Sequence, residues 1–364
     1  MKILYLTYPR HDYLADQIYT GLCKLLGWEN IRDFPWKPHY HDPAYKVPSL
    51  PQNPGRAYEL NEIITGLERK EYDLLVLSTL RKETVQALES VWEKVDLPSR
   101  VLIDGDDPPN IREDLFDRFR LSLYFKREYQ LSWVNGPSMR SWAARWHTFG
   151  RNRELYQRTF PLPFSINLET VPHLGGMQKD LDLSFVGLIS NRKRIKAVNF
   201  LKTVPDVRFE GWVYAEPTDR KSKLALGSLS ILKEKIKGDQ RISETERGVK
   251  LSYNEYFSLL GRSKFALSVP GSGFDTLRYW EIVAAKVLLI SEKPFIFIPH
   301  NFEHQKHALF CRSDFRDVPD LIKVYGRDDA AREQIIEAAY EHLLCFHTCE
   351  KRAMQFLEIC RKSV

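Results

Sequence analysis

The sequence has few cysteines, no long apolar run and no leader of the secretory kind. Its five cysteines, an odd number, stand at 23, 311, 345, 349 and 360, which is neither a disulfide framework nor a paired zinc motif, so we expect free thiols. No stretch of about 18 apolar residues is present. Residues 1–8 lead straight into charged sequence, where a signal peptide would continue with apolar residues. These absences predict a soluble, cytoplasmic protein.

A large excess of one charge is also missing. The chain has 54 basic and 48 acidic residues and a net charge of +6, spread over a large surface. This balance does not call for a nucleic acid partner, and we expect none. A mildly basic surface suits phosphorylated ligands or peripheral association with an anionic membrane, and composition does not choose between them.

The length predicts more than one domain. At 364 residues the chain exceeds the roughly 250–300 residues at which a single hydrophobic core stops growing. Prolines and a Gly175-Gly176 pair weaken the pattern before a new strand begins. We therefore predict a first domain over 1–175, a second over 176–340, and a C-terminal helix over 341–364 that packs back on the first.

Strands alternate with helices in the first domain, which predicts a parallel, doubly wound sheet. Strands are expected at 1–8, 72–79 and 99–104, with a helix ending at Gly27 and an irregular excursion over 33–54. Parallel sheets bind ligands beyond the carboxyl ends of their strands. The polar residues that follow the expected strands are His11, Asp12, Ser78, Thr79 and 104–107.

The second half repeats the alternation. Expected strands lie at 181–186, 207–211, 265–269 and 287–291, and a helix is expected over 276–285. The segment 220–248 is polar and rich in lysine. Both halves are therefore assigned to the α/β class.

A glycine-rich loop joins the strand at 265–269 to the helix at 276–285. Gly271, Ser272 and Gly273 let backbone N–H groups approach a ligand, and the helix begins close by, near Asp275 and Thr276. Together these features hold phosphate without a metal ion.

Two charged residues of the following helix extend this prediction. Arg278 can add a bidentate phosphate contact, and Glu281, one turn later on the same face, can accept both hydroxyls of a ribose. The alternative is an ordinary glycine turn, with Asp275 as the helix N-cap and Glu281 on the surface.

Four cations follow the strand at 181–186, namely Arg192, Lys193, Arg194 and Lys196. Their place at a strand's carboxyl end points Arg192 or Arg194 at a diphosphate. The alternative is a solvated helix face.

The C-terminal half resembles two related groups, the exostosin-type domain and the bacterial CgeB-like glycosyltransferases. The matching stretches are 263–267, 271–281, 284–285 and 287–290, then His347-Thr348 and Arg352-Ala353. The resemblance implies a GT-B fold, in which two Rossmann-like domains with parallel sheets face a central cleft. It places a nucleotide-sugar donor on the C-terminal domain and a glycan or other hydroxyl acceptor on the N-terminal one, with Glu281 on the donor ribose.

The sequence departs from the retaining GT-B pattern at one position and has no metal-binding signature in its C-terminal half. Retaining GT-B enzymes often carry a second glutamate at the position of Gly273, so the stereochemistry stays open. Asp104-Gly105-Asp106 mimics the metal signature of another glycosyltransferase fold, but it lies in the acceptor half. We expect neither a metal ion nor a cofactor.

The predicted activity is a glycosyl transfer in surface or secreted glycan assembly. Asp12 is the first candidate for the base that removes the acceptor proton, and His11 follows, with Asp104, Asp106 and Asp107 behind them. Each can equally be a helix cap or a turn former. A non-catalytic nucleotide-sugar-binding protein and an epimerase of the same fold remain alternatives.

An aromatic, basic stretch lies in the later part of the first domain, with Trp133, Trp142, Trp146, Arg140 and Arg145. It is interpreted first as an amphipathic helix that covers the core. A membrane-surface or acceptor-stacking role is the alternative.

Overall fold

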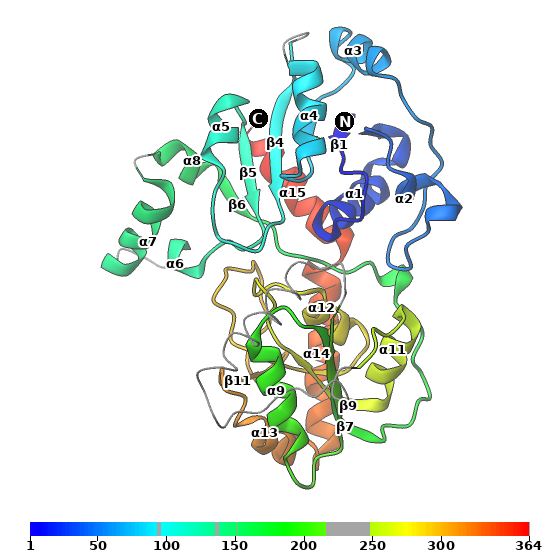
Figure 1. Ribbon diagram of the computed structural model, residues 1–364, viewed down its shortest axis with the longest axis vertical. Helices are drawn as coiled ribbons and strands as arrows, with labels where there is room; N and C mark the ends of the chain where they lie inside the picture. The colour runs from blue at the N-terminus through cyan, green and yellow to red at the C-terminus, as the bar shows by residue number, and fades with distance from the viewer. Residues whose placement is uncertain (93–95, 135–137, 151, 216–247, 364) are drawn as a thin grey trace, which may run out of the picture. The chain divides into compact units, whose positions relative to one another are not determined.

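A computed structural model describes residues 1–92, 96–134, 138–150, 152–215 and 248–363 of the chain (Figure 1). Its contacts divide the chain into two compact units. Unit 1 comprises Met1–Thr170, Phe295–Asn301 and Leu344–Val364, and unit 2 comprises Val171–Pro294 and Phe302–Leu343. Most of the lysine-rich segment at 220–248 lies outside the described residues.

The sheet of unit 1 has six strands, and every pair is parallel. Their order is β2-β1-β3-β4-β5-β6. The strands are β1 (Ile3–Leu6), β2 (Ile31–Phe34), β3 (Leu74–Leu77), β4 (Ser99–Asp104), β5 (Leu123–Lys126) and β6 (Thr159–Pro161). The main helices are α1 (Tyr13–Leu26), α3 (Leu60–Glu68), α4 (Lys82–Trp92), α5 (Glu113–Arg118), α7 (Met139–Phe149) and α8 (Arg153–Gln157), with single turns α2 (Pro38–His41) and α6 (Leu131–Val134).

The start of the chain folds as its sequence pattern dictates. All four residues of β1 are buried, as expected for a strand covered on both faces of a parallel sheet. Asp12 caps α1 by accepting a hydrogen bond from the N–H of Ala15, and Gly27 ends the helix at a φ of 84°, which favours glycine. The polar residues between β1 and α1 are thereby fixed at the carboxyl edge of the sheet.

The C-terminal helix α15 (Cys349–Ser363) packs against α1 within unit 1. The two backbones approach closely at Gly21, where an added Cβ would lie 2.1 Å from the carbonyl oxygen of Cys349 and 2.7 Å from the Cβ of Ala353. The segment before α15 is also fastened, because the N–H of Ile166 donates to the oxygen of His347 and the N–H of Cys349 donates to the oxygen of Ile166. Residues far apart in sequence thus form one core.

The sheet of unit 2 has five parallel strands in the order β11-β10-β9-β7-β8. The strands are β7 (Leu181–Leu188), β8 (Phe209–Tyr214), β9 (Ser263–Ser268), β10 (Leu288–Glu292) and β11 (Leu309–Cys311). The helices are α9 (Arg192–Lys202), α11 (Tyr253–Arg262), α12 (Leu277–Ala284), α13 (Val318–Tyr325) and α14 (Asp329–Phe346), whose last residues continue into unit 1. A buried core joins β7, β9, β10 and α9 through Leu183, Phe265, Ile290 and Val198.

The expected fold class is confirmed: the chain has two Rossmann-like α/β units, each with a parallel sheet. The five cysteines are free, as expected, and only that at 345 is exposed. The strand β2 was not expected and begins two residues before the predicted irregular excursion at 33. Within the described residues, no helix has the length and apolar character needed to cross a membrane.

Candidate functional site

Unit 2 has its topological switch point at β7, which pairs with β8 on one side and β9 on the other. Chain connections leave in opposite directions there, and sheets of this kind bind ligands beside the loops that follow the two strands at this point, here β7 and β9. The first loop leads into α9 through Asn191, and the second contains Gly271. The two sequence features predicted to bind a donor therefore lie at one edge of one sheet.

Side chains of the α9 start hold the glycine loop in place. Asn191 caps α9, and its amide Nδ2 donates to the carbonyl oxygens of Pro270 at 3.1 Å and Gly271 at 2.6 Å. The Arg194 guanidinium, only 6% exposed, donates to the carbonyl oxygens of Val269 (3.0 and 3.2 Å), Pro270 (3.2 Å) and Leu188 (2.9 Å). Arg194, predicted to touch a diphosphate, thus orients the loop.

A second guanidinium meets the first at the end of β7. Arg278, in the first turn of α12, lies over the ring of Phe185 at 4.8 Å and donates to the carbonyl oxygen of Val186. A Cβ built on Gly187 would lie 3.0 Å from Nη2 of Arg278 and 3.5 Å from Nη1 of Arg194. Two cations converge on one backbone glycine, which favours an anion beside them.

Two buried polar atoms at this place have no hydrogen-bond partner among the described residues. They are Nε of Arg278 and the hydroxyl oxygen of Ser190. A Cβ on Gly271 would lie 3.2 Å from Nη2 of Arg194 and 3.4 Å from that hydroxyl, so the glycine leaves room for the backbone alone. Buried polar groups normally find partners, and a bound anion would supply them.

Both parts of the alternative reading of α12 are wrong. The N-cap is Thr276, and Asp275 is buried with its carboxylate accepting a hydrogen bond from Nε1 of Trp280 at 3.0 Å. Arg278 is accordingly the second residue of the helix, one position earlier than predicted. Glu281 is not a surface residue either, because its side chain is half-buried.

Burial raises the pKa of the Glu281 carboxyl to about 7, although the positive charge of Arg278 and the hydroxyl of Tyr256 act in the opposite direction. The Tyr256 hydroxyl is itself buried and interacts with the Glu281 carboxyl. A half-buried carboxyl with a neighbouring hydroxyl is a ready acceptor for ribose hydroxyls.

The remaining predicted donor residues surround this centre unevenly. Arg192 and Ser272 are exposed, whereas Gly273 is buried. The hydroxyl of Thr276 lies 3.3 Å from that of Ser268, at the end of β9. The structure thus brings together Arg194, Gly271, Arg278 and Thr276 at the strand ends, with Glu281 further along α12.

Unit 1 carries a second cluster at the carboxyl ends of β1, β3 and β4. These strands are adjacent and parallel, so the predicted polar loops do share one edge. An added Cβ on Gly105, in the loop after β4, would lie 3.8 Å from Oδ1 of Asp12, in the loop after β1. The hydroxyl of Ser78 is buried there and has no partner among the described residues.

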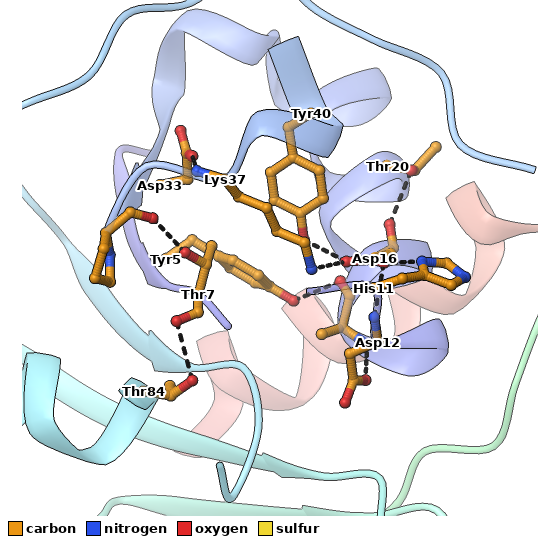
Figure 2. Close-up of polar contacts among 12 residues, drawn as sticks. Tyr5, Thr7, His11, Asp12, Asp16, Thr20, Asp33, Lys37, Tyr40 and Thr84 are labelled. Atoms are coloured by element: carbon orange, nitrogen blue, oxygen red, sulfur yellow. Dashed lines mark hydrogen bonds and ion pairs between the residues drawn. The ribbon is translucent and has the colours of Figure 1, made fainter. Parts of the chain in front are cut away.

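Asp16 is the centre of this cluster (Figure 2). Its carboxylate is 2% exposed and accepts hydrogen bonds from Nζ of Lys37 at 2.5 Å, the hydroxyl of Tyr40 at 2.8 Å and the N–H of Asp12 at 3.0 Å. Burial raises the pKa of Asp16, but the Lys37 charge and the His11 hydrogen bond outweigh this and leave the pKa below its usual value. Asp16 is therefore an ionised carboxylate.

An ionised Asp16 fixes the state of His11. Nδ1 of His11 lies 2.5 Å from Oδ2 of Asp16, and a carboxylate can only accept, so Nδ1 carries the proton. With Nδ1 as the donor to Asp16, Nε2 is the ring atom left to accept a proton. This atom is buried and has no hydrogen-bond partner among the described residues, although the side chain as a whole is 24% exposed. The arrangement is that of a base held in one tautomer by a carboxylate.

Asp12, the first sequence candidate, has a different part in this cluster. One carboxylate oxygen accepts the N–H of Ala15 and caps α1. Burial and the charge of Asp16 raise the pKa of Asp12, while Lys37 and Arg81 act against them. Asp12 remains at the same strand end as His11, with less freedom to accept a substrate proton.

The candidates after β4 are engaged in pairs. Asp104 is fully buried with Lys126 at 2.9 Å and the hydroxyl of Tyr124 at 2.5 Å. Asp107 pairs with Arg127 at 2.5 Å. Asp106 lies 3.6 Å from Arg81, and both are partly exposed. No group of three or more residues able to hold a metal ion occurs in the described part of the chain.

Sequence reasoning missed Asp16, Lys37 and Tyr40. Asp16 stands one helical turn after Asp12, a spacing that puts both on one face of α1, and this signal was available. Lys37 and Tyr40 lie in the excursion at 33–54, where no periodicity tells which side chains turn inward. Their contacts with Asp16 show that part of this excursion belongs to the cluster.

Solved structures that share this fold are GT-B glycosyltransferases. Anabaena HepE in complex with UDP has 13% identity and a TM-score of 0.59, with all of both chains covered. Sucrose-phosphate synthase from Thermosynechococcus elongatus has 11% identity and a TM-score of 0.58. A glycosyltransferase from Rickettsia africae has 10% identity and a TM-score of 0.58. Each of these two matches covers 99% of this chain and 98% of the other chain.

Sequence comparison narrows the likeness to one part of the chain. The model of the glycosyl transferase-like family matches residues 198–358. This segment includes α12 and the later pairs His347-Thr348 and Arg352-Ala353. No curated protein sequence matches the chain. The protein is thus glycosyltransferase-like in its fold and over this segment.

Proposed function

We propose that the protein is a glycosyltransferase that moves a sugar from a nucleotide-sugar to an acceptor hydroxyl. The observation that carries the proposal is the convergence of Arg194 and Arg278 on Gly187, beside the glycine loop of unit 2. Two cations, a rigid backbone loop and the start of α12 suit a diphosphate. A UDP-sugar is the first donor to test, because HepE was solved with UDP and with UDP-glucose.

The donor would lie along α12. Its diphosphate would face Arg278 and the N–H groups of the loop at 271–273, and its ribose hydroxyls would bind the Glu281 carboxylate. The Tyr256 hydroxyl, which interacts with this carboxyl, would complete the ribose contacts. Arg192 is exposed at the first turn of α9 and would reach only the outer phosphate oxygens.

His11 would serve as the base. As the acceptor oxygen bonds to the anomeric carbon, its proton passes to Nε2 of His11, and the bond from that carbon to the leaving nucleoside diphosphate breaks. Asp16 stabilises the imidazolium that forms, and the guanidinium of Arg278 stabilises the charge on the leaving diphosphate. This direct displacement inverts the anomeric carbon. Asp12 is the alternative base at the same strand end.

Several finer assignments belong to the proposal. We place the protein with the CgeB-like and exostosin-type groups, on the residues from 263 to 353 quoted above. We expect it to work without metal or cofactor, in the cytoplasm, at the periphery of a membrane, and on surface or secreted glycans. The arginine pair supports the metal-free part, because it supplies the positive charge that a leaving diphosphate needs.

A thermal-shift screen tests the donor site directly. The protein is mixed with UDP-, GDP-, CMP- and dTDP-sugars, with EDTA throughout, and melting is followed for wild type and Glu281→Ala. A ligand at about a hundred times its dissociation constant stabilises the native state by roughly 2.7 kcal/mol, which raises the melting temperature by several degrees. We expect a shift with one nucleotide family that is lost in Glu281→Ala.

Glu337→Ala is the matched control, because Glu337 is a half-exposed carboxylate of the same unit paired with Lys286 on the surface. It should keep the full ligand shift. If none of the nucleotide-sugars raises the melting temperature of folded wild type, the donor assignment fails. If the shift is present but no acceptor consumes the donor, the non-catalytic binding protein becomes the better reading.

A further inference from the structure

Helix α7 of unit 1 exposes an apolar stripe that its own fold does not use. Its inward face is buried through Ser141 and Phe149, which packs on the ring of Trp133. Positions 139, 142, 143 and 146 follow the helical repeat on the other side. Met139 is 86% exposed, Trp142 58% and Trp146 48%, and Figure 1 shows α7 at the periphery of its unit.

The two indoles form one surface. Their ring centroids lie 5.7 Å apart and their planes are within 14° of parallel, so Trp142 and Trp146 stack along the helix. Val134, at the end of α6, is a further exposed apolar residue, at 41%. Stacked tryptophans that stay this exposed are costly in water and mark a contact surface.

The stretch of sequence that carries this stripe has charges of one sign, and the acidic Glu113 and Glu154 first appear beside Asn152 and Arg153 at the start of α8. Residues 129–153 contain four arginines and no aspartate or glutamate, although the whole chain has almost as many acidic as basic residues. Of these arginines, Arg145 donates to the carbonyl oxygen of Trp133 at the base of the helix, and Arg153 is exposed at the start of α8. His147 is exposed on α7 itself.

This combination selects among partners. A second copy of the chain would bring two arginine-rich faces together, which opposes association. An anionic lipid surface offers opposite charge to the arginines and an interfacial layer in which indoles are favoured. We propose that Met139, Trp142 and Trp146 form a membrane-docking face that binds bilayers containing anionic lipids.

The inference rests on the peripheral membrane association that we propose, and it does not depend on sugar transfer. Membrane binding is measured with vesicles, whereas donor binding by unit 2 is measured by thermal shift, so the two can fail independently. Vesicles of phosphatidylcholine, alone or mixed with phosphatidylglycerol, are sedimented with the full-length protein. Wild type should bind the mixed vesicles, and added salt should weaken this binding. Brominated lipids in the same vesicles should quench tryptophan fluorescence.

Three variants make the test specific. Trp142→Ser/Trp146→Ser should lose about tenfold or more in vesicle affinity, because the two indoles that would be buried in the bilayer are removed. Arg153→Glu should lose about fivefold per unit of charge, on anionic vesicles only. Trp28→Ser removes another tryptophan of unit 1, 41% exposed, and should bind as wild type does.

All three changes are at exposed side chains, so unchanged melting temperatures serve as the check on folding. Wild type that does not sediment with mixed vesicles overturns the proposal, and so does a double tryptophan variant that still binds fully. Sedimentation without quenching by brominated lipids also overturns it. Self-association of wild type that the double variant abolishes would assign the face to a second copy of the chain.

Discussion

Nδ1 of His11 lies 2.5 Å from Oδ2 of Asp16, and the other oxygen of that carboxylate is held at 2.5 Å by Nζ of Lys37. The lysine compensates the buried carboxylate, which keeps it ionised and able to orient the imidazole. The same carboxylate accepts the N–H of Asp12, at the start of α1. One buried ion pair thus sets both the tautomer of the proposed base and the geometry of the loop that carries it.

Replacing His11 by Gln should lower turnover by about a hundredfold or more, because the loss of a general base costs that much. The effect should appear in kcat at saturating donor, with the donor-induced thermal shift unchanged. Asp12→Asn is the comparison. It keeps an oxygen that can cap α1, so it should retain turnover within a few-fold if His11 is the base. A large loss of turnover in Asp12→Asn, with His11→Gln close to wild type, would move the assignment to Asp12.

Replacing Asp16 by Asn should affect both stability and turnover. Lys37 would be left buried without its counter-charge, which costs about 3–5 kcal/mol. Turnover should fall as well, because the imidazole of His11 loses the carboxylate that orients it. Adding Lys37→Met should recover stability and leave turnover low. A double variant with wild-type kinetics would contradict a positioning role for Asp16.

The sequence predicted the bounds of helices and strands best where a local signal marks them, whereas the strands expected at 1–8 and 72–79 are shorter in the structure, Ile3–Leu6 and Leu74–Leu77. Asp12 and Gly27 delimit α1 by capping chemistry, and 99–104 is a buried strand whose bounds match β4. The short strands β2, β5, β6 and β11 were missed, since three or four residues are too few to show a period. Their pairing is decided by neighbours far away in the chain.

The candidate site could be predicted less well than the fold. Arg194 was placed at the correct strand end, but two of its carbonyl partners, at 269 and 270, come from a loop about 75 residues away. A sequence shows that a cation is near a crevice, but it does not show whether carbonyl groups already occupy it. The exposed tryptophans of α7 posed the same problem, because the apolar face of a helix is normally the buried one.

Substitutions of Arg194 and Arg192 should therefore differ in their effects on the melting temperature. Arg194→Met removes the donor for three backbone carbonyl groups and leaves buried acceptors unsatisfied, at about 1–3 kcal/mol each when no water replaces it. Both the melting temperature and donor affinity should fall. Arg192→Met, at an exposed position of the same helix, should leave the melting temperature unchanged and alter only donor affinity. Equal destabilisation by the two changes would contradict the anchoring role of Arg194.

The close approach of α1 and α15 gives a test of packing. Gly21→Ala would press a methyl group on the Cys349 carbonyl and the Ala353 methyl group, and overpacking of this kind costs about 1–3 kcal/mol. The helix-propensity gain from glycine to alanine, about 0.5–1 kcal/mol, does not offset it. Gly261→Ala on α11 is the control, because its nearest neighbour is the flexible Met177 thioether. Denaturant unfolding should show a loss only for Gly21→Ala.

Glu281 links donor binding to pH and to stability. Burial raises its pKa from 4.5 to about 7, so the native state keeps a proton that the unfolded chain has already lost between these values. Native stability must therefore fall as pH rises through this window. Glu281→Gln removes the buried charge, so the variant should have a higher melting temperature than wild type above pH 7. Near pH 4.5 the two melting temperatures should differ little.

The same substitution should weaken donor binding where it raises stability. A ribose diol donates its hydroxyls best to an ionised carboxylate, so wild-type affinity for the nucleotide should decline as pH falls below about 7. The glutamine variant should bind weakly at every pH, with no such slope. Calorimetric titration across this range measures both curves. A variant that is neither more stable at high pH nor weaker in binding would show that Glu281 is not the carboxylate that holds the donor.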